Sequence, residues 1–236
     1  MKKSHLKHII KEIIKEEIEG PGIFVPRGIE GRKEKKTMMD YKKIQDYIKN
    51  GSKGDLYLHN SQITELPDNL QAGGDLYLGN SQIIKLPNNL TVGGSLDLEK
   101  TKITELPNNL TVGGFLDLRN TPIQNLPDNL QVGGSFHLEN TPQITELPDN
   151  LKVGGYLDLE KTKITTLPDN LTVGGYLGLE NLPIQKLPDN LKVAGTLNLR
   201  NTPLSKKYSE QEIRDIIKRQ DGNVGERILV HRLIKI

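Results

Sequence analysis

Hydrophobic side chains recur along most of this chain with a period of about 20 residues, a length typical of solenoids in which each unit forms one coil. Each unit is marked by an isoleucine or leucine, and the spacing of these markers is constant except for one step that is longer by a single position: Ile63, Ile83, Ile103, Ile123, Ile144, Ile164, Ile184 and Leu204. A Leu-Pro pair follows each isoleucine, and a Gly-Gly or Ala-Gly pair precedes the next unit. The sequence therefore predicts a repeat protein.

Within one unit, the pattern predicts a short strand followed by a return path. The unit reads G-G-x-L-x-L-x-N-T-x-I-x-x-L-P-D-N-L-x-V. Leu96 and Leu98 alternate with polar residues, as in a strand that buries one face. Ile103 and Leu106 then point inward, while the glycines and Pro107 allow tight corners. A single coil buries too few apolar side chains to be stable alone, so we expect neighbouring coils to stack in a parallel sheet.

The unit resembles the leucine-rich repeat, which is built around L-x-L-x-x-N-x-L-x-x-L-P. Its shortness and its Leu-Pro step look most like the bacterial subclass found in secreted effector proteins. The resemblance covers residues 54–204 and implies an α/β solenoid with a parallel concave β-sheet, a mostly irregular convex side and helical caps at both ends. One position departs from the family. Where the family has Asn, most units have Ser or Thr, as at Thr101, and an Asn stands one place earlier in most copies.

A parallel β-helix with squarer coils is the alternative fold. In residues 90–98 the apolar positions alternate through the glycine pair, so a second short strand before Gly93 would square off the coil. The Leu-Pro step favours the leucine-rich repeat.

The two ends of the chain carry helical patterns, which divide it into an amphipathic helix, a linker, a cap helix, the solenoid and a C-terminal cap: residues 1–19, 20–36, 37–53, 54–204 and 205–236. The second helix leads directly into the first coil, where a bare end would expose apolar side chains and strand edges. In the last segment, Ser209 and Glu212 have the spacing of a capping box, which predicts a helix to about Arg219. Gly222 and Gly225 then predict a turn, and residues 227–234 a strand.

The first helix has an apolar stripe that must pack against something: Leu6, Ile9, Ile10, Ile13 and Ile14. It either folds back on the solenoid, or docks the chain onto a partner or a second copy. Its sequence is similar to N-terminal helices on some proteins of large tailed bacteriophages. That resemblance implies, as an alternative function, a structural or assembly protein of a virion.

Charge and composition limit the classes of partner and the compartments that we expect for this chain. The net charge of +2 combines a basic N-terminal stretch with an acidic solenoid, which carries 11 Lys and Arg against 17 Asp and Glu in residues 51–203. An acidic surface repels nucleic acid. The chain has no cysteine and no apolar run long enough to span a bilayer, and charges interrupt its N-terminal apolar stretch. We therefore expect a cytoplasmic or virion-associated protein, with no membrane insertion.

The motifs of catalysis are missing from the repeat. Its glycine pairs open no helix and lack a following Lys-Ser or Lys-Thr, its histidines lack metal-ligand spacing, and its acids align only because the units align. The ubiquitin-ligase domain that some bacterial effectors with this repeat carry needs a catalytic cysteine, which the chain lacks. We expect no enzyme, no metal and no cofactor.

What remains is a protein-binding surface on the concave face, formed by the residues that flank the two strand leucines. Most of the few aromatic side chains lie there beside acids, a composition suited to an interface, although tyrosine and phenylalanine also suit strands in general. The candidate partner-binding residues are Tyr57, Tyr77, Asp97, Glu99, Phe115, Asp117, Arg119, His137, Tyr156, Asp158, Glu160 and Tyr176.

Overall fold

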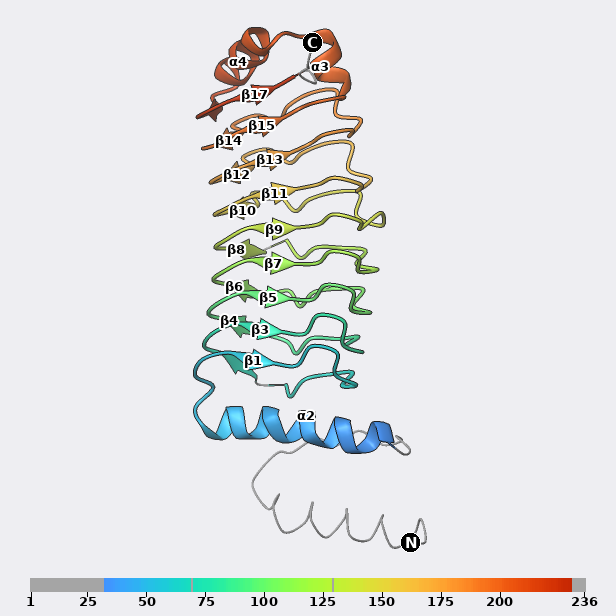
Figure 1. The fold of residues 1–236 in the computed structure, drawn as a ribbon. Coiled ribbons are helices and arrows are strands. Elements are labelled where there is room, and N and C mark those ends of the chain that lie inside the picture. Colours follow the sequence, from blue (N-terminus) through green and yellow to red (C-terminus); the bar gives the residue numbers. More distant parts are fainter. Residues whose placement is uncertain (1–31, 69, 129, 231–236) are drawn as a thin grey trace, which may run out of the picture. The chain divides into compact units, whose positions relative to one another are not determined.

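The computed structural model describes residues 32–68, 70–128 and 130–230, which form a parallel β-solenoid (Figure 1). Each coil contributes two short strands, one on either side of the glycine pair, and equivalent strands of successive coils pair in parallel. Sheet A, which follows the glycines, contains β1 (Leu56–Tyr57), β3 (Leu76–Tyr77), β5 (Leu96–Asp97), β7 (Leu116–Asp117), β9 (Phe136–His137), β11 (Leu157–Asp158), β13 (Leu177–Gly178), β15 (Leu197–Asn198) and β17 (Ile228–Leu229). Sheet B, which precedes them, contains β2 (Gln71–Ala72), β4 (Thr91–Val92), β6 (Thr111–Val112), β8 (Gln131–Val132), β10 (Lys152–Val153), β12 (Thr172–Val173), β14 (Lys192–Val193) and β16 (Asn223–Val224).

The register of sheet A places each residue beside its repeat equivalent. Leu96 pairs with Leu76 on one side and Leu116 on the other. The single longer step of the repeat leaves this register intact, because Leu157 still pairs with Phe136. The additional residue is accommodated in the turn that precedes Ile144, whose N–H donates to the carbonyl of Thr141 at 3.1 Å.

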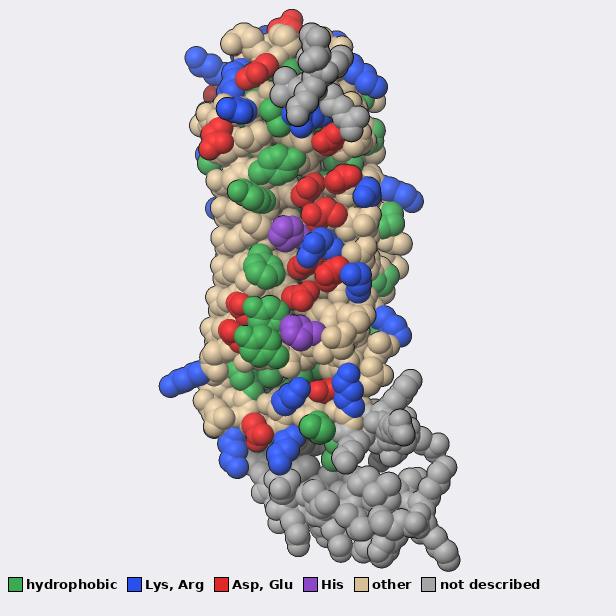
Figure 2. All heavy atoms as spheres, in the orientation of Figure 1, with side chains coloured by type: hydrophobic (Ala, Val, Ile, Leu, Met, Phe, Trp, Pro, Cys, Tyr) green, Lys and Arg blue, Asp and Glu red, His purple; other side chains and the backbone are tan. Residues whose placement is uncertain are grey.

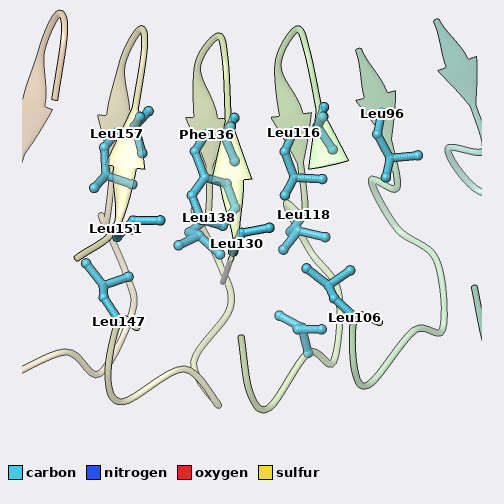
Figure 3. Packing of buried hydrophobic residues seen from close by; sticks show 14 of the residues in the cluster. Leu96, Leu106, Leu116, Leu118, Leu130, Phe136, Leu138, Leu147, Leu151 and Leu157 are labelled. Carbon is cyan, nitrogen blue, oxygen red and sulfur yellow. The ribbon is translucent and has the colours of Figure 1, made fainter. Parts of the chain in front are cut away.

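The apolar positions of the repeat form one continuous core inside the coils (Figure 3). Leu96, Leu98, Ile103 and Val112 are all 0–1% exposed, so both sheets and the return path contribute to the same interior. Because most coils present the same side chain at each position, leucine mostly packs on leucine and isoleucine on isoleucine along the stack, with Phe136 as an exception. This confirms the inward positions that the repeat predicts.

Asparagine and threonine together stabilise the corner that follows each strand of sheet A. Asn120 has a positive φ of 58°, a conformation that asparagine tolerates better than most residues, which explains why Asn stands one place earlier than in the family pattern. Thr121 Oγ1 donates to the carbonyl of Leu118 within its own coil, at 2.7 Å. Asparagine side chains connect successive coils, since Asn140 Nδ2 donates to Asn120 Oδ1 at 3.2 Å.

Sheet B is formed by the second strand of each coil, which the β-helix alternative predicts. The leucine-rich-repeat resemblance implies a mostly irregular side at this position. Successive coils pair in parallel in both sheets, and the concavity implied by the resemblance is not confirmed. The solenoid and its regular period stand in either case.

Helices stand at both ends of the stack. Helix α2 (Arg32–Lys49) takes in residues 32–36, which the sequence assigns to the linker, and its Ile44 belongs to the same apolar cluster as Leu56 of the first coil. At the other end come α3 (Pro203–Lys207) and α4 (Glu210–Arg219), and α4 begins with the predicted capping box of Ser209 and Glu212. After α4, β16 and β17 extend sheets B and A. The predicted first helix, with Leu6, Ile9, Ile10, Ile13 and Ile14, lies outside the described residues.

Candidate functional site

The outward side chains of sheet A form three parallel columns along the solenoid, here called the outer face of sheet A (Figure 2). The columns arise because side chains alternate along a strand and neighbouring strands lie about 4.8 Å apart. The first column is Asp55, Asp75, Ser95, Phe115, Ser135, Tyr156, Tyr176 and Thr196. The second is Tyr57, Tyr77, Asp97, Asp117, His137, Asp158, Gly178 and Asn198, and the third is His59, Gly79, Glu99, Arg119, Glu139, Glu160, Glu180 and Arg200. All twelve candidate partner-binding residues lie in these columns.

The first column connects successive coils. Asp55 Oδ1 accepts a hydrogen bond from the N–H of Asp75 at 2.8 Å, and Asp75 Oδ1 accepts one from the N–H of Ser95 at 2.6 Å. Ser95 Oγ in turn accepts from the N–H of Phe115 at 3.2 Å. These side chains satisfy the backbone donors that directly precede the strands of sheet A, so their first role is structural.

The aspartates of the second column are also bound locally. Asp97 Oδ1 accepts from the N–H of Glu99 at 2.9 Å, and Asp158 Oδ1 accepts from the N–H of Glu160 at 3.0 Å. Each therefore closes the corner after its strand, as short polar side chains commonly do. One carboxylate oxygen is committed to the backbone in each case, and Oδ2 is the oxygen left for other contacts.

At the N-terminal end, three aromatic side chains form a cluster. The rings of Tyr57 and Tyr77 stack with centroids 4.9 Å apart and planes 8° apart, and His59 lies tilted against both. Tyr77 OH donates to Asp75 Oδ2 at 2.7 Å, and this hydrogen bond raises the pKa of Tyr77 to about 12. Tyr57 is 53% exposed, so the cluster offers an open aromatic surface.

In the middle of the outer face, an arginine closes over two acids. Arg119 Nε donates to Oδ1 and Oδ2 of Asp117 at 2.9 and 3.0 Å, and its Nη2 lies 3.8 Å from Glu99 Oε2. Asp117 is only 4% exposed, so the guanidinium compensates a carboxylate that has lost most of its water. Asp117, Arg119 and Glu99 thus neutralise one another in part, which leaves less free charge here than the sequence indicates.

Towards the C-terminal end, the outer face opens into a pocket of about 520 Å³. The rings of Tyr156 and Tyr176 meet at 71° with centroids 6.2 Å apart, and Tyr156 is 58% exposed. Asp158 and Tyr176 lie so close to Gly178 that a Cβ there would be 2.7 Å from both Asp158 Oδ1 and Tyr176 Cε1, so this position requires glycine. The pocket is lined by His137, Glu139, Tyr156, Asp158, Gly174, Gly175, Tyr176, Ala194, Gly195, Thr196 and Glu226.

The pocket is strongly acidic. Burial raises the pKa of Asp158, and the charges of Glu139 and Glu160 raise it further. The interaction of His137 Nδ1 with Glu139 Oε1, 3.6 Å apart, raises the pKa of the imidazole. Burial alone would raise the pKa of Glu139, but the interaction with His137 and the charge of Arg119 bring it below its usual range.

Four of the lining residues are among the sequence-based candidates: His137, Tyr156, Asp158 and Tyr176. Sequence reasoning missed the other seven: Glu139, Gly174, Gly175, Ala194, Gly195, Thr196 and Glu226. The missed signal for Glu226 is in the C-terminal segment, where Val224-Gly225 followed by Ile228 repeats the Val-Gly-Gly-x-Leu spacing with Glu226 in place of the second glycine. β16 and β17 pair with β14 and β15, so this segment forms a further partial coil.

Within the part of the chain that the structure describes, no group of three or more His, Asp or Glu side chains is arranged to hold a metal ion. None of the described helices is both long and apolar enough to cross a membrane.

Comparison with models of known protein families and with curated proteins finds no match for this chain. The class of protein that the fold defines is a parallel β-solenoid repeat protein.

Proposed function

We propose that this chain is a non-catalytic binding module whose working surface for a protein partner is the outer face of sheet A. The single observation that carries the proposal is the exposure of aromatic side chains there. Of the six exposed large hydrophobic residues among those described, three lie on this face: Tyr57, Phe115 and Tyr156. Exposed aromatic rings beside carboxylates are typical of the anchors of protein interfaces.

The charge of this face specifies the partner further. Glu160, Glu180 and the half-buried Asp97 and Asp158 all place carboxylates on this face. Arg119 offsets little of this charge, because its guanidinium already forms an ion pair with Asp117. A basic protein surface is complementary to such a face, and nucleic acid is not.

We further propose that the coils are of the leucine-rich-repeat class, on the strength of the Leu-x-Leu strand and the Leu-Pro step.

We also propose that the helices at the two ends of the solenoid are caps. Tyr47 OH of α2 donates to the carbonyl of Ser52 at 2.8 Å and accepts from the N–H of Gly73 at 3.0 Å, so the helix is tied to the first coils. A terminal coil needs such cover because its apolar side chains and strand edge are otherwise open to solvent.

A structural or assembly role, in a virion and dependent on residues 1–19, is the second proposal. The unbroken parallel pairing of successive coils favours it, because a regular solenoid makes a rigid spacer. In that case the outer face of sheet A is solvated surface, and partners or a second copy bind through the N-terminal helix.

Affinity capture from a lysate of the native host separates these two proposals. The full chain is compared with residues 31–236, which form one compact unit, so that the shortened chain keeps all of α2. A binding module that works through sheet A retains its partner in the shortened chain. Loss of the partner from the shortened chain alone would contradict the first proposal and support the second.

A further inference from the structure

The outer face of sheet A contains the same pair of acids twice. Asp117 and Glu99 form the first pair, and Asp158 and Glu139 occupy the equivalent positions two coils further on, because His137 pairs with Asp117 on one side and with Asp158 on the other. In each pair, an aspartate from the second column stands beside a glutamate from the third column of the preceding coil. The backbone bond is repeated too, since Oδ1 of each aspartate accepts the N–H two residues later.

The two pairs differ in what neutralises them. At the first pair, Arg119 donates through Nε to both oxygens of Asp117 and reaches Glu99 with Nη2. At the second pair, the position of Arg119 is occupied by Glu160, a third acid. Among the described residues, no lysine or arginine forms an ion pair with Asp158, and Lys161 lies 3.7 Å from Glu160 instead. His137 Nδ1 lies 3.6 Å from Glu139 Oε1 and offsets part of the charge of that glutamate. The second pair therefore has the acids of an arginine site without the arginine, and Asp158 is its acid without a cationic partner among the described residues.

The second pair also faces an open pocket, which the first does not line. Glu139, Asp158 and Glu226 place three carboxylates in the lining, and the lining residues include no lysine or arginine. Tyr156 and Tyr176 supply two ring faces at 71° to each other. Positive charge is attracted both to carboxylates and to the faces of aromatic rings, so the pocket favours a cation.

We propose that this pocket binds an arginine side chain of the protein partner, in the way that Asp117 and Glu99 bind Arg119 within the chain. The proposal rests on the proposed function and names the group that the outer face of sheet A recognises. Arginine fits better than lysine, because its planar guanidinium forms a fork on a carboxylate and stacks on a tyrosine ring at the same time. A neutral sugar could stack on the rings, but it would leave Asp158 without a counter-charge.

The probe is the peptide acetyl-Gly-Arg-Gly-amide, titrated into the full chain and followed by NMR. Its control contains citrulline, which keeps the shape of arginine and removes its charge. We expect saturable shifts of Gly178 and the rings of Tyr156 and Tyr176 with the arginine peptide, and at least about tenfold weaker binding of the citrulline peptide, because a charged donor is lost.

Three variants test the equivalence of the two acid pairs. Asp158→Asn keeps the backbone acceptor, as Asn198 Oδ1 does for the N–H of Arg200 at 3.1 Å, and should weaken peptide binding by about tenfold. Glu160→Arg copies Arg119 and should close the pocket from within, abolishing binding. Glu146→Arg makes the same change of charge at an exposed position on the return path and should bind the peptide like the wild type.

Equal binding of the arginine and citrulline peptides, absence of any saturable shift, or undiminished binding by Glu160→Arg would each overturn the proposal. So would a neutral oligosaccharide that binds this pocket and still binds the Glu160→Arg variant. Failure here is distinct from failure of the proposed function. Suppose that the protein partner binds the Phe115→Ala variant more weakly but binds the Asp158→Asn variant like the wild type. That result would rule out the arginine site and still support the outer face of sheet A as the interface.

Discussion

Arg119 holds Asp117 through both carboxylate oxygens, although the two residues are only two positions apart on the outer face of sheet A. The strand makes this possible, because residues two apart point to the same side. Asp117 is buried, whereas the side chain of Arg119 is 42% exposed, so the pair stands at the boundary between core and solvent.

Removing the guanidinium should destabilise the fold. Arg119→Gln leaves the buried Asp117 carboxylate without its partner, and we expect a loss of about 1–3 kcal/mol, less than for a fully buried pair because solvent screens the exposed arginine. Urea denaturation measures it. The control is Lys100→Gln, which breaks the ion pair of the exposed Lys100 with Glu99 and should change stability by less than about 0.5 kcal/mol. Equal effects of the two variants would show that the pair is no more than surface charge.

The register of the repeat makes a second prediction. Ile103 is 0% exposed and Glu105 is exposed, two positions along the same return path. Ile103→Asp places an unpaired charge in the stack and should cost about 4 kcal/mol or more, whereas Glu105→Lys should be nearly neutral. Thermal melts of both variants decide the matter. Similar losses in the two would mean that the inward positions are misassigned.

Replacing a buried serine of the first coils with threonine should stabilise the fold. Ser81 is 1% exposed and its Oγ has no hydrogen-bond partner, whereas the equivalent Thr101 Oγ1 donates to the carbonyl of Leu98 at 2.7 Å. Ser81→Thr adds a buried methyl group and favours the bonded rotamer, so we expect a gain of about 0.5–1.5 kcal/mol. Thr101→Ser, the reverse change one coil later, should lose a similar amount. A fall in melting temperature for Ser81→Thr would contradict the account of this corner.

The titration of His137 reports on the pocket. Glu139 and, to a smaller extent, Asp117 raise the pKa of His137, while burial and Arg119 oppose them. A histidine whose pKa is raised by folding contributes stability that is fully present below its unfolded value of about 6.5 and is lost as the pH rises through the folded value. Glu139→Gln should therefore lower the pKa of His137 and remove this contribution, as followed by the ring proton signals in NMR. An unchanged titration curve would show that the two side chains do not interact.

Much of the fold follows from the sequence because the repeat averages out local ambiguity. One copy of Leu96 and Leu98 is a weak strand signal, but the same alternation at every step of the repeat leaves one stacked solution. The strand Thr91–Val92 could be raised only as an alternative, because a two-residue strand has no periodicity of its own and pairs only when the coils stack. The capping box of Ser209 was predictable, since it depends on residues three positions apart.

The candidate site was predictable as a face but not as an arrangement. Column membership follows from the repeat, so Tyr57 and Tyr77 could be placed side by side without a structure. Their stacking could not, nor could the bond of Asp158 to the backbone of Glu160, because rotamers depend on the space that neighbours leave. Glu226 reaches the pocket only because β16 and β17 resume the solenoid after α4, an event that the break in the repeat conceals.

The central claim is that the outer face of sheet A is the interface, and calorimetric titration of the captured partner tests it most directly. The double variant Phe115→Ala/Tyr156→Ala truncates two exposed rings and should cost about 1–2 kcal/mol of binding for each ring, or more, with little change in melting temperature. The matched variant Glu105→Lys/Glu146→Lys changes exposed acids on the return path and should bind the partner like the wild type. Wild-type affinity in the ring variant together with lost affinity in the return-path variant would contradict the claim and move the interface to the other side of the solenoid.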